Sequence, residues 1–139
     1  MIRQDVTLEI LNSKYNSNMC EFIGIEYTEI GKDYLCAKMP VSERTRQPLG
    51  LLHGGASVVL AESVGSLASN LCVDNTKQYC VGLSINANHV KSLTEGFVYA
   101  KAEALHIGGK THIWNIKVTT EDDELVCMSR LTVAVLDKK

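Results

Sequence analysis

The chain has 139 residues, a formal net charge of -2, and a composition that is 45% hydrophobic and 22% charged. This length suits one domain with a core of its own, so we expect residues 1–139 to form a single domain. The balanced composition argues against intrinsic disorder. The near-neutral charge excludes a strong overall field for nucleic acid or an anionic membrane, although it leaves room for a local basic patch.

Five cysteines are scattered along the chain without a C-x-x-C pair. Their odd number and spacing argue against a disulfide framework or a thiolate zinc site, and they indicate reduced thiols. The first nine residues carry charged side chains and lack the apolar stretch of a signal peptide. No apolar run approaches the roughly 18 residues that a membrane span needs. We therefore expect a cytoplasmic protein with no membrane and no nucleic-acid partner.

The first third of the chain is predicted to contain short elements. Apolar residues on one side of a helical turn, followed by Asn16-Ser17-Asn18 as a stop signal, indicate a helix. Further on, Pro48 and Gly50 interrupt a segment without a clean period, which is typical of a loop. The expected elements are a helix over 7–15, strands over 22–30 and 33–39 around a turn at 31–33, and a loop over 42–52.

The longest segment without strand character, residues 54–72, is rich in Ala, Leu, Val and Ser. Its apolar residues cover most of a helix circumference, which is typical of a buried helix. Later in the chain apolar and polar residues alternate, which predicts strands over 81–88, 98–104 and 114–119, followed by a mostly apolar strand over 125–136. We expect an α+β fold in which an antiparallel sheet wraps one long central helix. The apolar last strand suggests that a second subunit covers the remaining face.

The predicted helix opens with Leu52-His53-Gly54-Gly55. Adjacent glycines at a helix start let other groups approach the backbone, and the first helical N–H groups are free to meet an incoming oxygen. Alternatively, the two glycines form only a tight entry turn with His53 as a cap or a packed ring. Both interpretations stay open on these residues alone.

Glu62 stands more than two turns into this apolar helix, where a bare carboxylate is costly to bury. It therefore either pairs with a Lys or Arg from elsewhere, since this helix has none, or lines a cavity. Ser66 lies one turn further on the same face, where it either fills space or holds a water with Glu62. Facing the Gly54 amide, the pair has the layout of a hydrolytic site: a base or nucleophile, a water holder and an oxyanion donor.

Other polar residues carry weaker signals. Gln47 either donates an amide hydrogen bond into the same cavity or is merely solvated, and the polar stretch Asn86, Asn88 and His89 is either functional or a solvated strand face. The turn over 106–111 is glycine-rich and basic, which suits a phosphate. It joins two strands and lacks the first glycine of a P-loop, so we reject a nucleotide triphosphatase. No H-E-x-x-H spacing supports a metal site.

Longer stretches of the chain carry a specific family resemblance. The chain resembles the hotdog-fold acyl-CoA thioesterases, and most of all the branch of the 1,4-dihydroxy-2-naphthoyl-CoA hydrolases and the enterobactin proofreading thioesterase. The phenylacetate-pathway thioesterases are more distant relatives. The resemblance covers nearly the whole chain and rests on the run Thr45-Arg46-Gln47-Pro48-Leu49-Gly50-Leu51-Leu52-His53-Gly54-Gly55 and its continuation to Ser66, and on residues 81–90, 106–111 and 129–132.

The resemblance implies an enzyme that hydrolyses an aryl- or acyl-coenzyme A thioester. Coenzyme A is then part of the substrate, and no separate cofactor is implied. The family builds its active sites across a homodimer interface and commonly pairs dimers into tetramers. We therefore expect a homodimer with shared active sites, assembled as a dimer of dimers.

The same resemblance assigns roles to individual residues. Glu62 matches the catalytic carboxylate and the Gly54 amide would polarise the thioester carbonyl. His53 and Gln47 would help to position that carbonyl, and Ser66 would hold the water or the carboxylate. The positions that match coenzyme A-binding residues are Gly82, His89, Val90, Lys91, Ser92, His106, Ile107, Gly108, Gly109, Lys110 and Thr111, of which Lys91 and Lys110 are expected phosphate contacts.

The chain departs from its relatives at two places. Ser84 stands where close relatives carry an acidic residue, and Gly109-Lys110-Thr111 replaces a more polar turn that contains Arg. These departures concern the nucleotide contacts and the acyl preference rather than the chemistry.

Two other functions stay open on the sequence. A hotdog enoyl-CoA hydratase or dehydratase also uses a His and a carboxylate on this scaffold, although the His-Phe-Pro-Gly type of dehydratase signature is absent here. A non-catalytic acyl-CoA-binding protein is the third function, and the retained pair of Glu62 and Ser66 argues against it.

Overall fold

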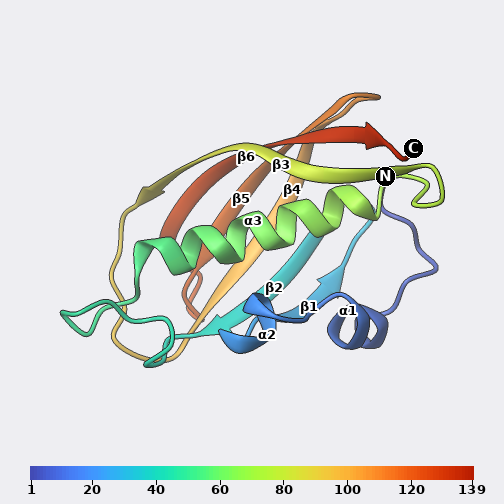
Figure 1. Ribbon diagram of the computed structural model, residues 1–139. Helices are drawn as coiled ribbons and strands as arrows, with labels where there is room; N and C mark the ends of the chain where they lie inside the picture. The colour runs from blue at the N-terminus through green and yellow to red at the C-terminus, as the bar shows by residue number, and fades with distance from the viewer.

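The computed structural model describes residues 1–139 as a curved six-stranded antiparallel sheet with one long helix across its concave face (Figure 1). The sheet has the order β1-β2-β4-β5-β6-β3. The predicted α+β arrangement of a sheet wrapped around one helix is confirmed. None of the helices has the length and apolarity that crossing a bilayer requires. The elements are α1 (Leu8–Lys14), α2 (Met19–Phe22), β1 (Glu26–Ile30), β2 (Tyr34–Pro40), α3 (Gly54–Asn70), β3 (Gln78–His89), β4 (Phe97–Ile107), β5 (Thr111–Thr119) and β6 (Leu125–Asp137).

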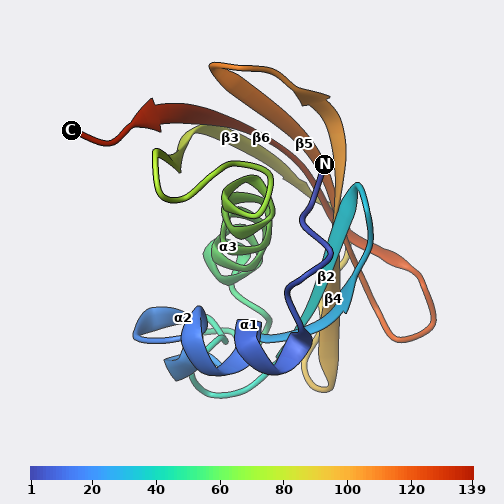
Figure 2. The same ribbon diagram turned by 90° about the vertical axis from the view of Figure 1, so that its right-hand side faces the viewer.

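The core lies between α3 and the concave face of the sheet. Figure 2 shows α3 end-on, with the sheet curving round one side and α1 and α2 lying beneath it. Every second residue of β5 from His112 to Val118 is buried, as the period-two pattern predicts. On α3 the buried residues lie on the side that faces the sheet: Ser57, Leu60, Ala61, Val64, Gly65, Leu67, Ala68 and Ser69. The other side of α3 is only half-buried in a single chain, so the prediction of a helix buried all round is wrong for one chain.

Three predicted boundaries are also wrong. The strand expected over 22–30 begins only at Glu26, because the preceding residues form the single-turn helix α2. Asn18 before α2 and Gly24 after it both have positive φ, a backbone conformation that does not continue a strand. The long helix ends at Asn70 rather than at residue 72. The turn expected over 106–111 is shorter, because β4 extends to Ile107 and β5 begins at Thr111.

The last strand, β6, lies inside the sheet between β5 and β3. Its apolar composition therefore reflects two neighbouring strands and a buried inner face, and this strand gives no separate evidence for a second subunit. The edges of the sheet are instead β1 and β3. An edge strand exposes a row of backbone N–H and C=O groups, which proteins usually cover.

The β1 edge is covered by side chains of the N-terminal segment. Asn12 donates to the Tyr27 carbonyl at 3.0 Å and accepts from the Tyr27 N–H at 2.8 Å, and Asn16 donates to the Ile25 carbonyl. These bonds block pairing with a further strand on this side of the sheet.

The β3 edge is covered only at its beginning. Asn70 at the end of α3 donates to the Cys80 carbonyl at 3.0 Å and accepts from the Cys80 N–H at 2.9 Å. From Gly82 to His89 no side chain caps the outer backbone groups. This stretch is therefore the one open edge of the sheet, and it lies along α3.

Candidate functional site

The first turn of α3 presents a free backbone N–H group. His53 is the N-cap, and its Nδ1 accepts a hydrogen bond from the Gly55 N–H at 2.8 Å. This confirms the capping interpretation of His53 and leaves Nε2 to carry the proton of the neutral ring. The Gly54 N–H donates to no group of the chain. Because it stands at the positive end of the helix dipole, it can donate to a carbonyl oxygen or oxyanion of a ligand.

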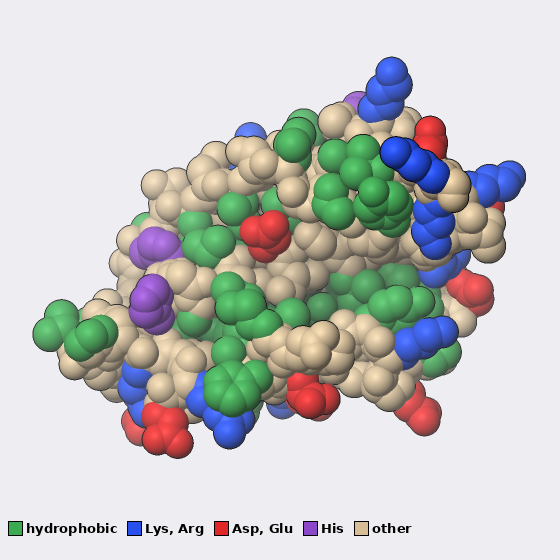
Figure 3. All heavy atoms as spheres, in the orientation of Figure 1, with side chains coloured by type: hydrophobic (Ala, Val, Ile, Leu, Met, Phe, Trp, Pro, Cys, Tyr) green, Lys and Arg blue, Asp and Glu red, His purple; other side chains and the backbone are tan.

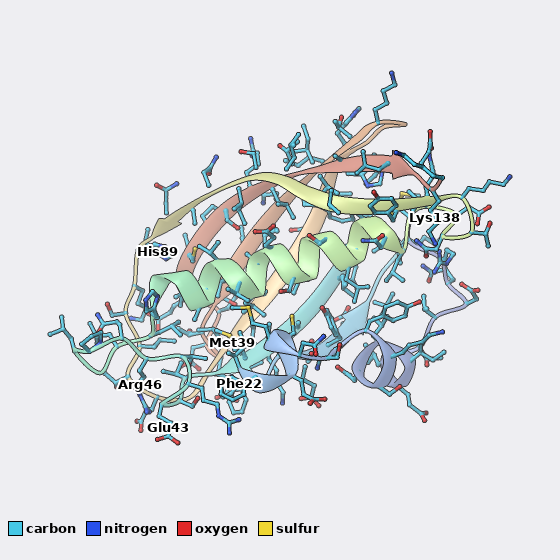
Figure 4. The ribbon with its side chains drawn as sticks, viewed as in Figure 1. Phe22, Met39, Glu43, Arg46, His89 and Lys138 are labelled. Carbon is cyan, nitrogen blue, oxygen red and sulfur yellow. The ribbon has the colours of Figure 1, made fainter.

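His89, the last residue of β3, lies beside this first turn (Figure 4). A Cβ atom at Gly54 would lie 3.0 Å from Nε2 of the His89 ring, a distance at which one of the two groups must give way. Glycine at position 54 therefore lets the ring lie against the helix start. The structure brings His53, Gly54 and His89 together, as the expected site requires.

Glu62 is the only ionisable side chain on α3. It is half-buried, and neither an ion pair nor a hydrogen bond holds its carboxylate within the chain. The alternative of a structural pair with Lys or Arg is therefore wrong for the single chain. Figure 3 shows this face of the molecule, on which an acidic side chain stands alone among apolar and neutral groups.

The carboxylate of Glu62 occupies space that Gly82 leaves free. A Cβ atom at Gly82 would overlap Oε2 of Glu62, far inside the 3.4 Å at which ordinary contacts begin. Gly82 was expected to contact coenzyme A. The structure shows that the absence of a side chain at this position lets the Glu62 side chain lie against β3.

Ser66 and Gln47 both keep free polar groups. Ser66 is half-buried, its hydroxyl has no partner in the chain, and only its carbonyl accepts a bond, from Asn70. It shares a helix face with Glu62 but does not hydrogen-bond to it. The Gln47 Oε1 accepts from the Leu49 N–H, which leaves the amide nitrogen of Gln47 free to donate.

The structure does not bring Glu62 and Gly54 of one chain together. They stand eight residues apart on one helix, which is about 12 Å along its axis at 1.5 Å per residue. A nucleophile or base and an oxyanion donor must both lie about 3 Å from the reacting group. Within one chain the Glu62 carboxylate and the free Gly54 N–H are therefore too far apart to act on one bond.

The residues expected to bind coenzyme A also fall into two groups. Residues 89–92 form the end of β3 and the segment after it, beside the first turn of α3, and there Lys91 pairs with Glu124 at 3.2 Å. The turn at 108–110 lies at the other end of α3, because His112 next to it is hydrogen-bonded to Ser69 in the last turn of that helix. Lys110 on this turn has no ion pair. The two groups are separated by most of a helix about 25 Å long.

A buried polar network of Ser69, His112 and Trp114 lies near this turn and was not predicted from the sequence. Ser69 Oγ accepts a hydrogen bond from Trp114 Nε1 at 2.7 Å and lies 2.9 Å from His112 Nδ1. Burial lowers the pKa of His112, against a hydrogen bond to the Gly108 backbone that raises it. The available signal was a histidine at an inward position of a period-two strand. The network ties the 108–110 turn to the end of α3.

The comparisons with known proteins return thioesterases. The profile of the thioesterase superfamily matches residues 49–127. The chain is 51% identical over 134 residues to the 1,4-dihydroxy-2-naphthoyl-CoA hydrolase of Escherichia coli K12, covering 96% of this chain and 98% of that protein. It is 42% identical to the proofreading thioesterase EntH of Cronobacter turicensis, with coverages of 96% and 97%. Among solved structures, a mutant of thioesterase PA1618 from Pseudomonas aeruginosa matches with a TM-score of 0.95 at 48% identity, covering 99% of both chains.

Proposed function

Since this chain belongs to the thioesterase superfamily and is a hotdog-fold thioester hydrolase, we propose that it is an acyl-CoA thioesterase in which Glu62 is the catalytic carboxylate. The observation that carries the proposal is the state of Glu62, which is half-buried on an apolar helix with no partner inside the chain. A carboxylate kept in this way is available as a base or a nucleophile.

The reaction needs few groups. A water oxygen attacks the thioester carbonyl carbon, the carbonyl oxygen gains negative charge, and the thiolate of coenzyme A leaves and takes up a proton. Glu62 either accepts the proton of the water or attacks first, forming a mixed anhydride that water cleaves. The free Gly54 N–H stabilises the oxyanion, and the unpartnered Ser66 hydroxyl holds the water or the carboxylate. Through their remaining N–H groups, His53 and Gln47 position the carbonyl.

The two halves of the site meet when two copies pair through β3. The open edge runs from Gly82 to His89; Glu62 lies against its first residue and Gly54 against its last. Antiparallel pairing of two copies about the centre of this stretch sets Gly82 of one chain level with the partner's His89. The same symmetry sets Glu62 level with the partner's Gly54, so each of two identical sites takes its carboxylate from one chain and its oxyanion donor from the other.

The pairing also reunites the two groups expected to bind coenzyme A. The 106–111 segment lies at the far end of α3, and in the dimer that end comes beside the partner's helix start and the segment that follows the partner's β3. We therefore propose a homodimer with two shared sites, in which Lys91 of one chain and Lys110 of the other contact phosphates. Binding would require Lys91 to exchange Glu124 for a phosphate.

A dimer of dimers extends the proposal. On the outer face of the sheet Arg130 lies directly between Asn86 and Asn115 on the neighbouring strands, and it has no carboxylate partner. This row carries two amides and a single charge, so it is less costly to cover with a second copy than a strongly charged sheet surface would be. A cytoplasmic location completes the proposal, since the five cysteines are free.

Mixing two inactive variants tests the shared site. Glu62→Gln should lower the turnover of benzoyl-CoA by orders of magnitude. Gln47→Ala should also lower this turnover relative to wild type, and both variants should keep the wild-type circular dichroism spectrum. When the two are unfolded and refolded together, a mixed dimer holds one intact site if the site is shared, and activity returns. If both residues act within one chain, mixing restores nothing.

Two further assays address mechanism and the other functions. Label from oxygen-18 water that appears on Glu62 in a single turnover would identify the nucleophilic route. Hydration of crotonyl-CoA would support the hydratase alternative, and saturable thioester binding without turnover would support a binding protein. Near-normal hydrolysis by Glu62→Gln would overturn the assignment of the carboxylate.

A further inference from the structure

The turn between β4 and β5, residues 108–110, carries the exposed Lys110 and lies at the end of the molecule where α3 finishes (Figure 1). Two of its three residues are glycine, so its backbone has much conformational freedom to lose when it closes on a ligand. The Gly108 N–H donates to the Thr111 carbonyl at 2.8 Å, and the Lys110 carbonyl accepts from the Val135 N–H at 2.9 Å. Both partners belong to the sheet, so these bonds do not fix the turn relative to α3.

His112 connects this turn to α3. Its ring is buried, with 1% exposure, at an inward position of β5. One ring nitrogen, Nδ1, lies 2.9 Å from the hydroxyl of Ser69 in the last turn of α3, and the ring also hydrogen-bonds to the Gly108 backbone. The ring therefore stands between the helix and the first residue of the turn, and it contacts both.

Trp114 fixes the orientation of that ring. An indole N–H can only donate, so the Ser69 hydroxyl accepts from Trp114 Nε1 at 2.7 Å and keeps its own proton to donate to His112 Nδ1. Nε2 then carries the proton of the neutral ring and is the donor available to Gly108. All three side chains are buried, and a buried network whose members are satisfied is rigid. The network therefore holds the turn at one place relative to α3.

The helix at one end of this network is the helix that carries Glu62, and in the proposed dimer Lys110 serves the same site as Glu62 of its own chain. We propose that His112 is a positioning residue, which holds the Lys110 turn in place to receive the phosphates of coenzyme A. The inference rests on the proposed function, in which Lys110 contacts a phosphate. A turn that is already ordered loses less entropy when its ligand binds, so the affinity is higher. The preference for coenzyme A over a thiol without phosphates therefore depends on a buried side chain.

The test compares two thioesters that share the benzoyl group. Benzoyl-CoA carries the phosphates, and benzoyl-pantetheine lacks them. In His112→Leu, we expect KM for benzoyl-CoA to rise about tenfold with kcat close to wild type, whereas both constants for benzoyl-pantetheine stay unchanged. The carboxamide of His112→Gln keeps an acceptor for Ser69 and a donor for Gly108, so this variant should restore most of the lost affinity.

Three further variants separate positioning from a loss of stability. Leu35→Val removes buried volume on β2, which β4 separates from β5, and it should leave the ratio of kcat/KM for the two thioesters unchanged. The double variant of His112→Leu and Lys110→Met should lose little more on benzoyl-CoA than Lys110→Met alone, because His112 acts through the turn that carries Lys110. Should His112→Leu fail to fold, Ser69→Ala makes the same comparison, since it keeps the ring and removes its link to α3.

The outcomes separate this role of His112 from the activity itself. Equal loss of kcat/KM on both thioesters in His112→Leu or Ser69→Ala would show a merely structural role and overturn the inference, while the thioesterase proposal stands. Additive losses in the double variant would overturn it as well. Equal kcat/KM of the wild type on the two thioesters would do the same, because the turn would then recognise no phosphate. A wild-type protein that hydrolyses neither thioester would overturn the proposed function and the inference together.

Discussion

The packing of Glu62 against Gly82 leads to a sharp prediction for the Gly82→Ala variant. The added methyl would overlap Oε2 of Glu62, and no backbone atom is in its way. The end of a flexible side chain can move aside, so the free energy of unfolding should change little. The carboxylate, however, must shift by about 1 Å to reach ordinary contact, and a misplacement of that size can cost about 100-fold in rate.

Steady-state kinetics with benzoyl-CoA and thermal unfolding together check this prediction. We expect kcat to fall 10- to 100-fold, which is about 1.4–2.7 kcal/mol of activation free energy, while KM and the melting temperature stay close to wild type. A rise in KM with kcat preserved would instead show that Gly82 serves coenzyme A binding. In the double variant with Glu62→Gln, the loss should equal that of Glu62→Gln alone, because both changes act on the same carboxylate.

A change on another exposed strand serves as the control for Gly82→Ala. Thr28→Ala changes an exposed strand side chain on β1, at the opposite edge of the sheet from β3, and it should leave kcat unchanged. If Gly82→Ala keeps the wild-type kcat, the carboxylate does not act from its place against β3. Losses that add in the double variant would likewise refute the mechanism, because they would mean that the two residues act independently.

Three further predictions concern the buried groups. Ser69→Ala leaves His112 and Trp114 without their shared partner and should cost about 1–3 kcal/mol in urea unfolding. Burial lowers the pKa of His112 in the folded chain, so the unfolded chain binds more protons between about pH 7 and pH 5. The free energy of unfolding should therefore decrease as the pH is lowered through that window, and it should decrease less in His112→Gln. Burial raises the pKa of Cys36 and Cys80 to about 11, so at pH 8 only about one thiol in a thousand is ionised and iodoacetamide should label them slowly until urea unfolds the chain.

Each of these has its own control. Ser13→Ala on exposed α1 should cost less than about 0.5 kcal/mol, and a similar cost for Ser69→Ala would mean that the network contributes nothing. An unchanged pH dependence in His112→Gln would show that other groups set the acid sensitivity. Rapid labelling of both cysteines in the folded protein would contradict their burial.

Much of the site could be predicted because its signals are local. A carboxylate inside an apolar helix is recognisable from a few neighbouring residues, since the cost of burying Glu62 is independent of the fold around it. Paired glycines at a helix start are equally visible. A cavity of about 330 Å³ beside α2 could not be predicted, for the opposite reason. Among the residues that line it, Met19, Arg44 and Val59 come from three segments that only folding brings together. The beginning of the strand expected over 22–30 was wrong, because the residues before Glu26 form α2 between two residues of positive φ, Asn18 and Gly24. A short apolar run does not reveal such a backbone conformation.

Sequence periodicity by itself determined the α+β class, the long helix and the inward positions of the strands, because those depend on which residues recur on one face. Only the tertiary structure decided which strand forms the open edge. The apolar last strand suggested a covering subunit, whereas the strand order places β6 inside the sheet and makes β1 and β3 its edges. Asn12 and Asn16 cover the β1 edge and Asn70 covers the beginning of β3, which leaves the rest of β3 open. The separation of about 12 Å between Glu62 and Gly54 also follows from the structure, because both residues lie on the one helix α3. Spacing along a chain shows which groups are present, but the distance between them depends on the elements that carry them.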